Sequence, residues 1–271
     1  MTRFTAPMRR KETAKGHYYV DANNHRIPGV TTILGDGVPK PALINWAANA
    51  TAEWAVDHFD ELLEMTPAAR LKKLSGARYE TTDKAKKRGT EVHGYGERLI
   101  KGEKVTAIPD ELRGHVEAYA RFLDKFEVDP ILIETPVVNY KIGYAGTLDL
   151  VAEITDSKGE RRILLLDLKT NEKGIFGETA LQLAAYRYAE KYIDAVGAEH
   201  DMPEVEGCGA ILISSDNAQL IPTTSGPEQF KSFRIAAAMR DIVNNSRDLV
   251  GAAVQPHDPN PSIARIVFEE N

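Results

Sequence analysis

The sequence predicts an α/β or α+β fold with a central mixed β-sheet flanked by helices and a helical N-terminal portion. Helical patterns dominate the chain up to about residue 127, and three β-type runs begin at Ile131. Helical and β-type segments then alternate up to about residue 250. Because no strong linker divides the 271 residues, we expect one domain over residues 1–271.

The first predicted elements are a hairpin and a helix. Residues 17–34 ("HYYVDANNHRIPGVTTIL") have β-rich flanks around the turn-forming cluster "DANN", which predicts a hairpin. Apolar residues at helical spacing then predict a helix over residues 42–59, opened by Pro39 and Pro41.

Three further helices are expected before the β-type region. They cover residues 67–74, 81–102 and 109–126. Thr82 or Asp83 is suited to cap the second, and Gly102 to end it. Pro109 and Asp110 start the third, which is clearly amphipathic.

The C-terminal half alternates strands with helices. We expect strands over 131–140, 145–155, 161–170, 207–215 and 218–224, and helices over 177–196 and 227–246. The polar turns "DSKGE" and "DN" join the second strand to the third and the fourth to the fifth. The Pro-rich end, about residues 251–271, is expected to be loose.

Composition limits the classes of function. With 42% hydrophobic and 27% charged residues, the chain is typical of globular proteins. A net charge of −6 argues against indiscriminate coating of nucleic acid but allows a local basic groove. Cys208, the single cysteine, excludes a disulfide, a cysteine-held zinc site or an iron–sulfur cluster within one chain. No apolar run spans a bilayer and no signal peptide is evident, so we expect a cytoplasmic protein.

Two acids and a lysine stand out on neighbouring strands. Asp149 lies between two leucines in "GTLDL", and Asp167 and Lys169 end "ILLLDLK". If "DSKGE" forms a hairpin, both acids share one face, with the flanking leucines on the other. Two close carboxylates repel, and Mg²⁺ or Mn²⁺ would remove that conflict. The alternative for each residue alone is a solvated strand end or a surface ion pair.

This set resembles the PD-(D/E)XK nuclease superfamily, in which an acid precedes an acid-x-lysine motif. Four further features are similar to its RecB-like branch, which includes phage exonucleases and CRISPR-associated nucleases. They are His93 in "RGTEVHGYGERL", Gly146 of "GTLD", Gln182 with Tyr186 in "QLAAY", and the early "IPGVTTIL". The resemblance covers roughly residues 17–240.

The resemblance implies a restriction-endonuclease-like core over about residues 131–250, preceded by the hairpin and helices of about 17–127. It implies a Mg²⁺- or Mn²⁺-dependent DNA exonuclease of phage or bacterial recombination, repair or replication. The ion would be held by Asp149, Asp167, the main-chain carbonyl of Leu168 and His93. Lys169 would orient water and offset phosphate charge.

Other residues receive roles from the same resemblance. Gln182 and Tyr186, four apart on one helix face, would act in catalysis or contact DNA. Glu134 would support the ion or bind a second one, although a strand-edge charge is an equal alternative. Thr170 would contact a phosphate, and Lys87 and Arg88 of "KAKKRG" would guide the DNA backbone, unless that run is a solvated face.

The expected partner is linear DNA bound at an end, with a recombination protein as a further candidate and no membrane. In a phage the location would be the host cytoplasm. Unlike many helicase-linked relatives, the chain lacks four cysteines for an iron–sulfur cluster, and it has no Walker A motif. The rivals are a structure-selective or sequence-specific endonuclease, and a non-catalytic DNA-binding or assembly protein that retains the fold.

Overall fold

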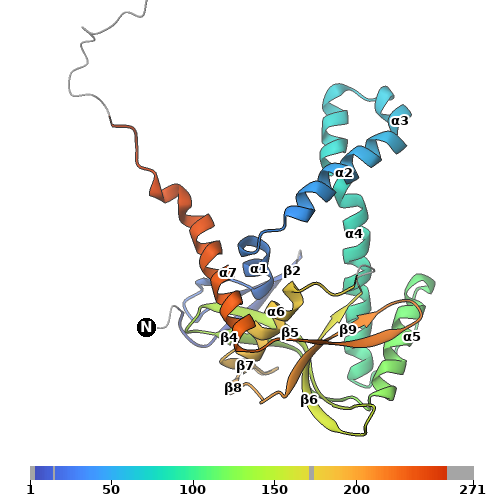
Figure 1. Ribbon diagram of the computed structural model, residues 1–271, viewed down its shortest axis with the longest axis vertical. Coiled ribbons are helices and arrows are strands. Elements are labelled where there is room, and N and C mark those ends of the chain that lie inside the picture. The colour runs from blue at the N-terminus through green and yellow to red at the C-terminus, as the bar shows by residue number, and fades with distance from the viewer. Residues whose placement is uncertain (1–3, 15, 171–173, 255–271) are drawn as a thin grey trace, which may run out of the picture.

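The chain adopts a mixed α/β fold in this computed structural model, which describes residues 4–14, 16–170 and 174–254 (Figure 1). The strands are β1 (Arg9–Thr13), β2 (Gly16–Val20), β3 (Arg26–Ile27), β4 (Asp129–Asn139), β5 (Tyr144–Thr155), β6 (Arg161–Lys169), β7 (Lys191–Ile193), β8 (Glu199–Asp201), β9 (Gly207–Ile213) and β10 (Ala218–Thr223). The helices are α1 (Val30–Gly37), α2 (Pro41–Asp57), α3 (Phe59–Glu64), α4 (Pro67–Ile100), α5 (Asp110–Lys125), α6 (Glu178–Arg187), α7 (Pro227–Asn245) and a short 3₁₀ turn, η1 (Ser246–Leu249). The predicted fold class is confirmed.

A mixed sheet of seven strands forms the centre of the described part of the chain. Its order is β10-β9-β6-β5-β4-β7-β8. The predicted hairpin is present, with β5 and β6 antiparallel and Leu150 opposite Leu166. Strand β9, which follows α6, β7 and β8 in the chain, pairs parallel with β6. Strand β10 pairs antiparallel with β9. The two strands that carry Asp149 and Asp167 are therefore neighbours in the middle of the sheet.

Helices cover both faces of this sheet. On one face α1, α6 and α7 bury a cluster that contains Ile33, Leu183 and Phe233. On the other face α4 and α5 bury a second cluster with Val92 and Phe122. A central sheet with both faces covered holds its strands rigidly, so the site on β5 and β6 has a fixed base.

The side-chain alternation of β5 reverses at Asp149. Leu148 packs in the α1–α6–α7 cluster whereas Leu150 packs in the α4–α5 cluster, although residues two apart normally share a face. The ladder pairs Leu148 with Thr135 and Leu150 with Ile133 but skips Asp149. Opposite that gap, Glu134 has φ 46°, which is unusual for a residue other than glycine. The expectation that Leu148 and Leu150 share one face is therefore wrong, because the strand is irregular at the acid, where neither Asp149 nor Glu134 takes part in the pairing.

The N-terminal hairpin is confirmed only in part. Strands β2 and β3 pair with Tyr19 opposite Ile27, and β1, which was not predicted, adds to β2. The segment after Gly29 is α1 rather than strand. Val30, Ile33 and Leu34 are each 1% exposed at helical spacing, and this pattern outweighs the β preference of "VTTI".

Helices α2, α3 and the first half of α4 form an arm that projects from the body (Figure 1). The two helices expected over 67–74 and 81–102 are one continuous helix of 34 residues. Thr66 caps it by accepting a hydrogen bond from Ala69, so the predicted caps Thr82 and Asp83 are wrong. Thr82 instead donates to helix carbonyls one turn earlier. Gly102, with φ +73°, follows the helix end as predicted.

The helix expected over residues 177–196 is shorter than predicted. It ends at Arg187, and the chain then enters β7, which pairs with β4 and β8. Ile193 is 7% exposed in a cluster with Val138. Tertiary burial in a sheet therefore overrides the helical appearance of "AEKYIDAV".

The other predicted helices and strands occur within a few residues of their expected positions, whereas α3 and β8 were not predicted. Residues 255–271, which include most of the expected loose end, lie outside the described part of the chain. Among the described residues, no helix combines the length and apolar character needed to cross a bilayer.

Candidate metal centre

The pairing of β5 with β6 ends at Leu150 opposite Leu166, and Asp149 and Asp167 are the next residues of the two strands. Asp149 Oδ2 accepts a hydrogen bond from the main-chain nitrogen of Leu168 at 2.7 Å. Lys169 Nζ lies 2.5 Å from Asp167 Oδ2. Asp167 is 1% exposed, so the solvated strand end that was the alternative interpretation does not apply to it.

His93 reaches this gap from α4. Its Nε2 lies 2.8 Å from the carbonyl oxygen of Leu168. Its Nδ1 lies 3.7 Å from Asp149 Oδ2 and 4.0 Å from Glu134 Oε1. Nε2 is placed to donate to the Leu168 carbonyl, so Nδ1 is the nitrogen that faces the two acids and that an ion would bind in place of a proton.

The donor set fits a divalent cation. Ligand atoms of His93, Glu134 and Asp149 all lie within 4.8 Å of one another. One imidazole and two carboxylates suit Mn²⁺ well, and the carboxylates also suit Mg²⁺. These three residues and the Leu168 carbonyl would hold the ion. Glu134, for which a plain strand-edge charge was an equal alternative, belongs to this cluster.

Asp167 has a different set of partners from the one expected of a metal ligand. Gln182 Nε2, on α6, donates to Asp167 Oδ1 at 2.8 Å. Asp167 Oδ2 is buried, and Lys169 Nζ approaches it without regular hydrogen-bond geometry. The Lys169 ammonium is thus the positive charge next to Asp167 Oδ2, and the predicted role of Asp167 as a metal ligand stays a prediction.

Burial and mutual repulsion shape the protonation of the site. Burial raises the pKa of Asp149, against the opposing charges of His93 and Lys169. Burial and the charge of Asp149 raise the pKa of Asp167. Burial alone would lower the pKa of His93, but Glu134 and the two aspartates outweigh it and raise that pKa to about 9. The pKa values of Asp149, Asp167 and His93 are all raised, so the clustered carboxylates favour positive charge next to them.

Tyr186, the second residue of the predicted Gln–Tyr pair, packs beneath the site. It is 3% exposed, and a Cβ atom at Gly146 would come within 2.4 Å of its ring. Only glycine at position 146 therefore lets the ring lie against β5. The structure gives Tyr186 a packing position, and its predicted contact with DNA stays a prediction.

The remaining predicted residues surround the site less closely. Thr170 follows Lys169 and lies near α4, where a Cβ atom at Gly89 would be 3.4 Å from its hydroxyl oxygen. Lys87 is exposed and lies 3.9 Å from Glu91, one turn along the helix. Arg88 is half-buried. Their predicted contacts with DNA stay predictions.

One structural support of the site had no signal in the sequence. Tyr19 Oη lies 2.8 Å from the hydroxyl oxygen of Thr147 and 2.9 Å from His17 Nε2. This chain of polar contacts fixes strand β2 to β5 two residues before Asp149. The two residues that it joins are 128 positions apart, beyond the reach of any local pattern.

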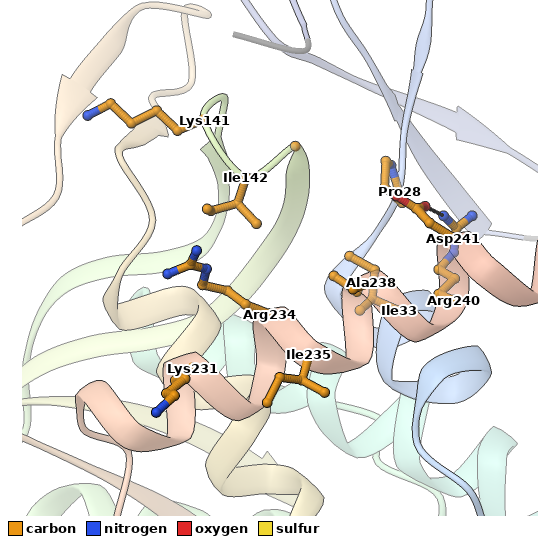
Figure 2. A pocket seen from close by; sticks show the side chains of 12 residues that line it. Pro28, Ile33, Lys141, Ile142, Lys231, Arg234, Ile235, Ala238, Arg240 and Asp241 are labelled. Atoms are coloured by element: carbon orange, nitrogen blue, oxygen red, sulfur yellow. Dashed lines mark ion pairs between the residues drawn. The ribbon is translucent and has the colours of Figure 1, made fainter. Parts of the chain in front are cut away.

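A cavity of about 570 Å³ lies elsewhere, between α7, α1 and the turn that joins β4 to β5 (Figure 2). Lys231 and Arg234 of α7 and Lys141 of the turn line it, and Figure 2 shows Arg240 paired with Asp241 at its edge. None of the candidate metal ligands is among its lining residues. The cavity is thus separate from the candidate metal centre.

No protein-family model matches the sequence, and no curated protein matches it either.

Proposed function

We propose that this chain is a metal-dependent DNA exonuclease of the PD-(D/E)XK type, acting in phage or bacterial DNA recombination, repair or replication. One observation carries the proposal: His93, Glu134 and Asp149 converge on one point beside the buried Asp167–Lys169 pair. A structural ion pair at a strand end would not need an imidazole from a distant helix and a residue with positive φ at Glu134.

Each residue has a definite task in this mechanism. The ion would supply Lewis-acid polarisation of a phosphate oxygen and a more acidic bound water. Gln182 holds the Asp167 carboxylate in place through its amide, and that carboxylate keeps the Lys169 ammonium close. Lys169 then orients the attacking water and stabilises the charge that develops on the phosphate. Water adds to phosphorus as the bond to the oxygen of the leaving nucleotide breaks, and a proton lost by the water reaches that oxygen through solvent.

The proposal is tested by incubating the purified chain with end-labelled linear DNA and with closed circular DNA. We expect shortening of the linear DNA with Mg²⁺ or Mn²⁺, and none with EDTA. Cleavage of the closed circle would identify an endonuclease instead. Retarded migration of DNA that stays full-length with either ion would identify a non-catalytic binding protein.

Direct binding of the ion gives a test that needs no DNA. Mn²⁺ is expected to raise the melting temperature of the chain, because an ion bound only by the folded state stabilises that state. The change His93→Gln should reduce this rise, since an amide replaces the imidazole ligand. Differential scanning fluorimetry with and without Mn²⁺ measures both. His200→Gln, at a histidine paired with Asp194, is the control and should leave the rise unchanged.

A further inference from the structure

Helix α4 carries a stripe of evenly spaced residues that ends at the metal centre. Lys72, Tyr79, Lys86 and His93 follow one another at intervals of seven residues. Seven residues fall about 20° short of two full helical turns, so the four side chains drift by about 60° in total. They therefore share one face of α4 from Lys72 to His93. We call these four residues the α4 stripe.

The stripe faces away from the rest of the arm. Helices α2 and α3 pack on the opposite side of α4, where Trp54 and Leu62 bury Ala77. Ala77 lies 140° or more around the helix from each stripe residue, at about 100° per residue. Lys72 and Lys86 are exposed, and Tyr79 is 49% exposed. The stripe is thus an open surface that leads to His93.

The charge of this surface is opposite to that of the whole chain. Residues 67–88 hold eight Lys and Arg and two Asp and Glu, whereas the full sequence has a net charge of −6. One of the two acids, Glu80, pairs with Lys73 and accepts from Trp54 on the α2 side of the helix. Beside the stripe, the guanidinium of Arg78 lies over the ring of Tyr79, 4.7 Å from its centre. Positive charge is therefore concentrated along the arm.

We infer that the α4 stripe is a track for the phosphate backbone of DNA on its way to the metal centre. The inference rests on the proposed function and adds the path and length of the bound substrate. From Lys72 to His93 the helix rises about 32 Å, which matches about nine base pairs of B-DNA. Lysines positioned along that length neutralise phosphates, and Tyr79 offers a hydroxyl and a ring between them.

The track makes the effect of a mutation depend on the length of the substrate. Lys86 lies about 10 Å from His93 along the helix, close enough to contact short and long DNA alike. Lys72 lies about 32 Å away and would contact only DNA longer than about nine base pairs. Lys158, an exposed lysine in the β5–β6 turn, supplies a control with the same change of charge.

The experiment measures the affinity of the full chain for labelled DNA hairpins with stems of about 6 and about 20 base pairs, by fluorescence anisotropy without divalent ions. Lys86→Glu should weaken binding of both stems, and Lys72→Glu should weaken only the long stem, each by about tenfold. For the long stem, Lys72→Glu should also reduce the slope of log affinity against log salt concentration by about one, as expected for the loss of one phosphate contact. Lys158→Glu should bind both stems like the unmodified chain.

Two results would overturn the track. One is equal affinity of Lys72→Glu and Lys158→Glu for the long stem. The other is a similar loss on both stems for Lys72→Glu, which would indicate a general charge effect. Because no ion is present, anisotropy reads the track without cleavage. If the stripe variants bind DNA normally and the unmodified chain still cleaves DNA, the inferred track is wrong and the proposed nuclease function stands.

Discussion

Replacing Asp149 with asparagine is expected to lower the rate of metal-dependent DNA cleavage by about 1,000-fold. The asparagine side chain keeps the volume of Asp149 and an oxygen that can accept from the Leu168 main chain. It loses the negative charge that the ion requires. Initial rates on end-labelled DNA at saturating Mn²⁺ measure the effect, and Lys169→Ala should be similarly inactive because the charge on the phosphate is no longer offset.

The fold should survive the Asp149 change. Two buried acids repel each other in the absence of a cation, so removing one charge is expected to leave the melting temperature of the metal-free chain unchanged or higher. Glu153→Gln, four residues along β5, is the matched control and should keep full activity. An Asp149→Asn variant that retains most of its activity would contradict the proposed metal centre.

Replacing Gly37 with alanine is expected to destabilise the folded state by about 3 kcal/mol, or about 10 °C in melting temperature. Gly37 is the buried last residue of α1, and a Cβ atom there would lie 2.0 Å from the main-chain oxygen of Ala236 in α7. Both atoms belong to helix backbones, so neither moves without separating α1 from α7. Thermal unfolding followed by circular dichroism measures the loss.

Gly35, in the same helix, gives the comparison. A Cβ atom at Gly35 would meet no atom within 4 Å. Gly35→Ala should therefore stabilise the protein by about 0.5–1 kcal/mol, as alanine does inside a helix. If Gly37→Ala and Gly35→Ala unfold at the same temperature, the packing of α1 on α7 does not require glycine at position 37.

Local patterns were sufficient for much of the fold. The polar turn at residues 156–160 and its apolar flanks predicted the β5–β6 hairpin, and amphipathic spacing predicted α5 and α7. Prediction failed where distant contacts decide the outcome. The segment after Gly29 has β-branched residues but packs as a helix against the sheet, and residues 191–193 become a strand only because β4 offers them a partner.

The candidate site was predictable to a similar degree. The period-two spacing of Asp167 and Lys169 and the hairpin to Asp149 predicted that these residues meet. The place of Glu134 remained open because its inclusion depends on a positive φ that no sequence pattern specifies. The seven-residue spacing from Lys72 to His93 was visible in the sequence. It became informative only once the two expected helices proved to be one.

The reversal of β5 also determines how little the protein must rearrange to accept an ion. In a regular ladder, the strand would have to distort before His93, Glu134 and Asp149 could converge on an ion. In this chain the pairing of β5 with β4 already omits Asp149. The strained backbone conformation at Glu134 forms when the chain folds and not when the ion binds. The reorganisation energy of ion binding is therefore small, and ion entry should be limited by loss of hydration water rather than by movement of the sheet.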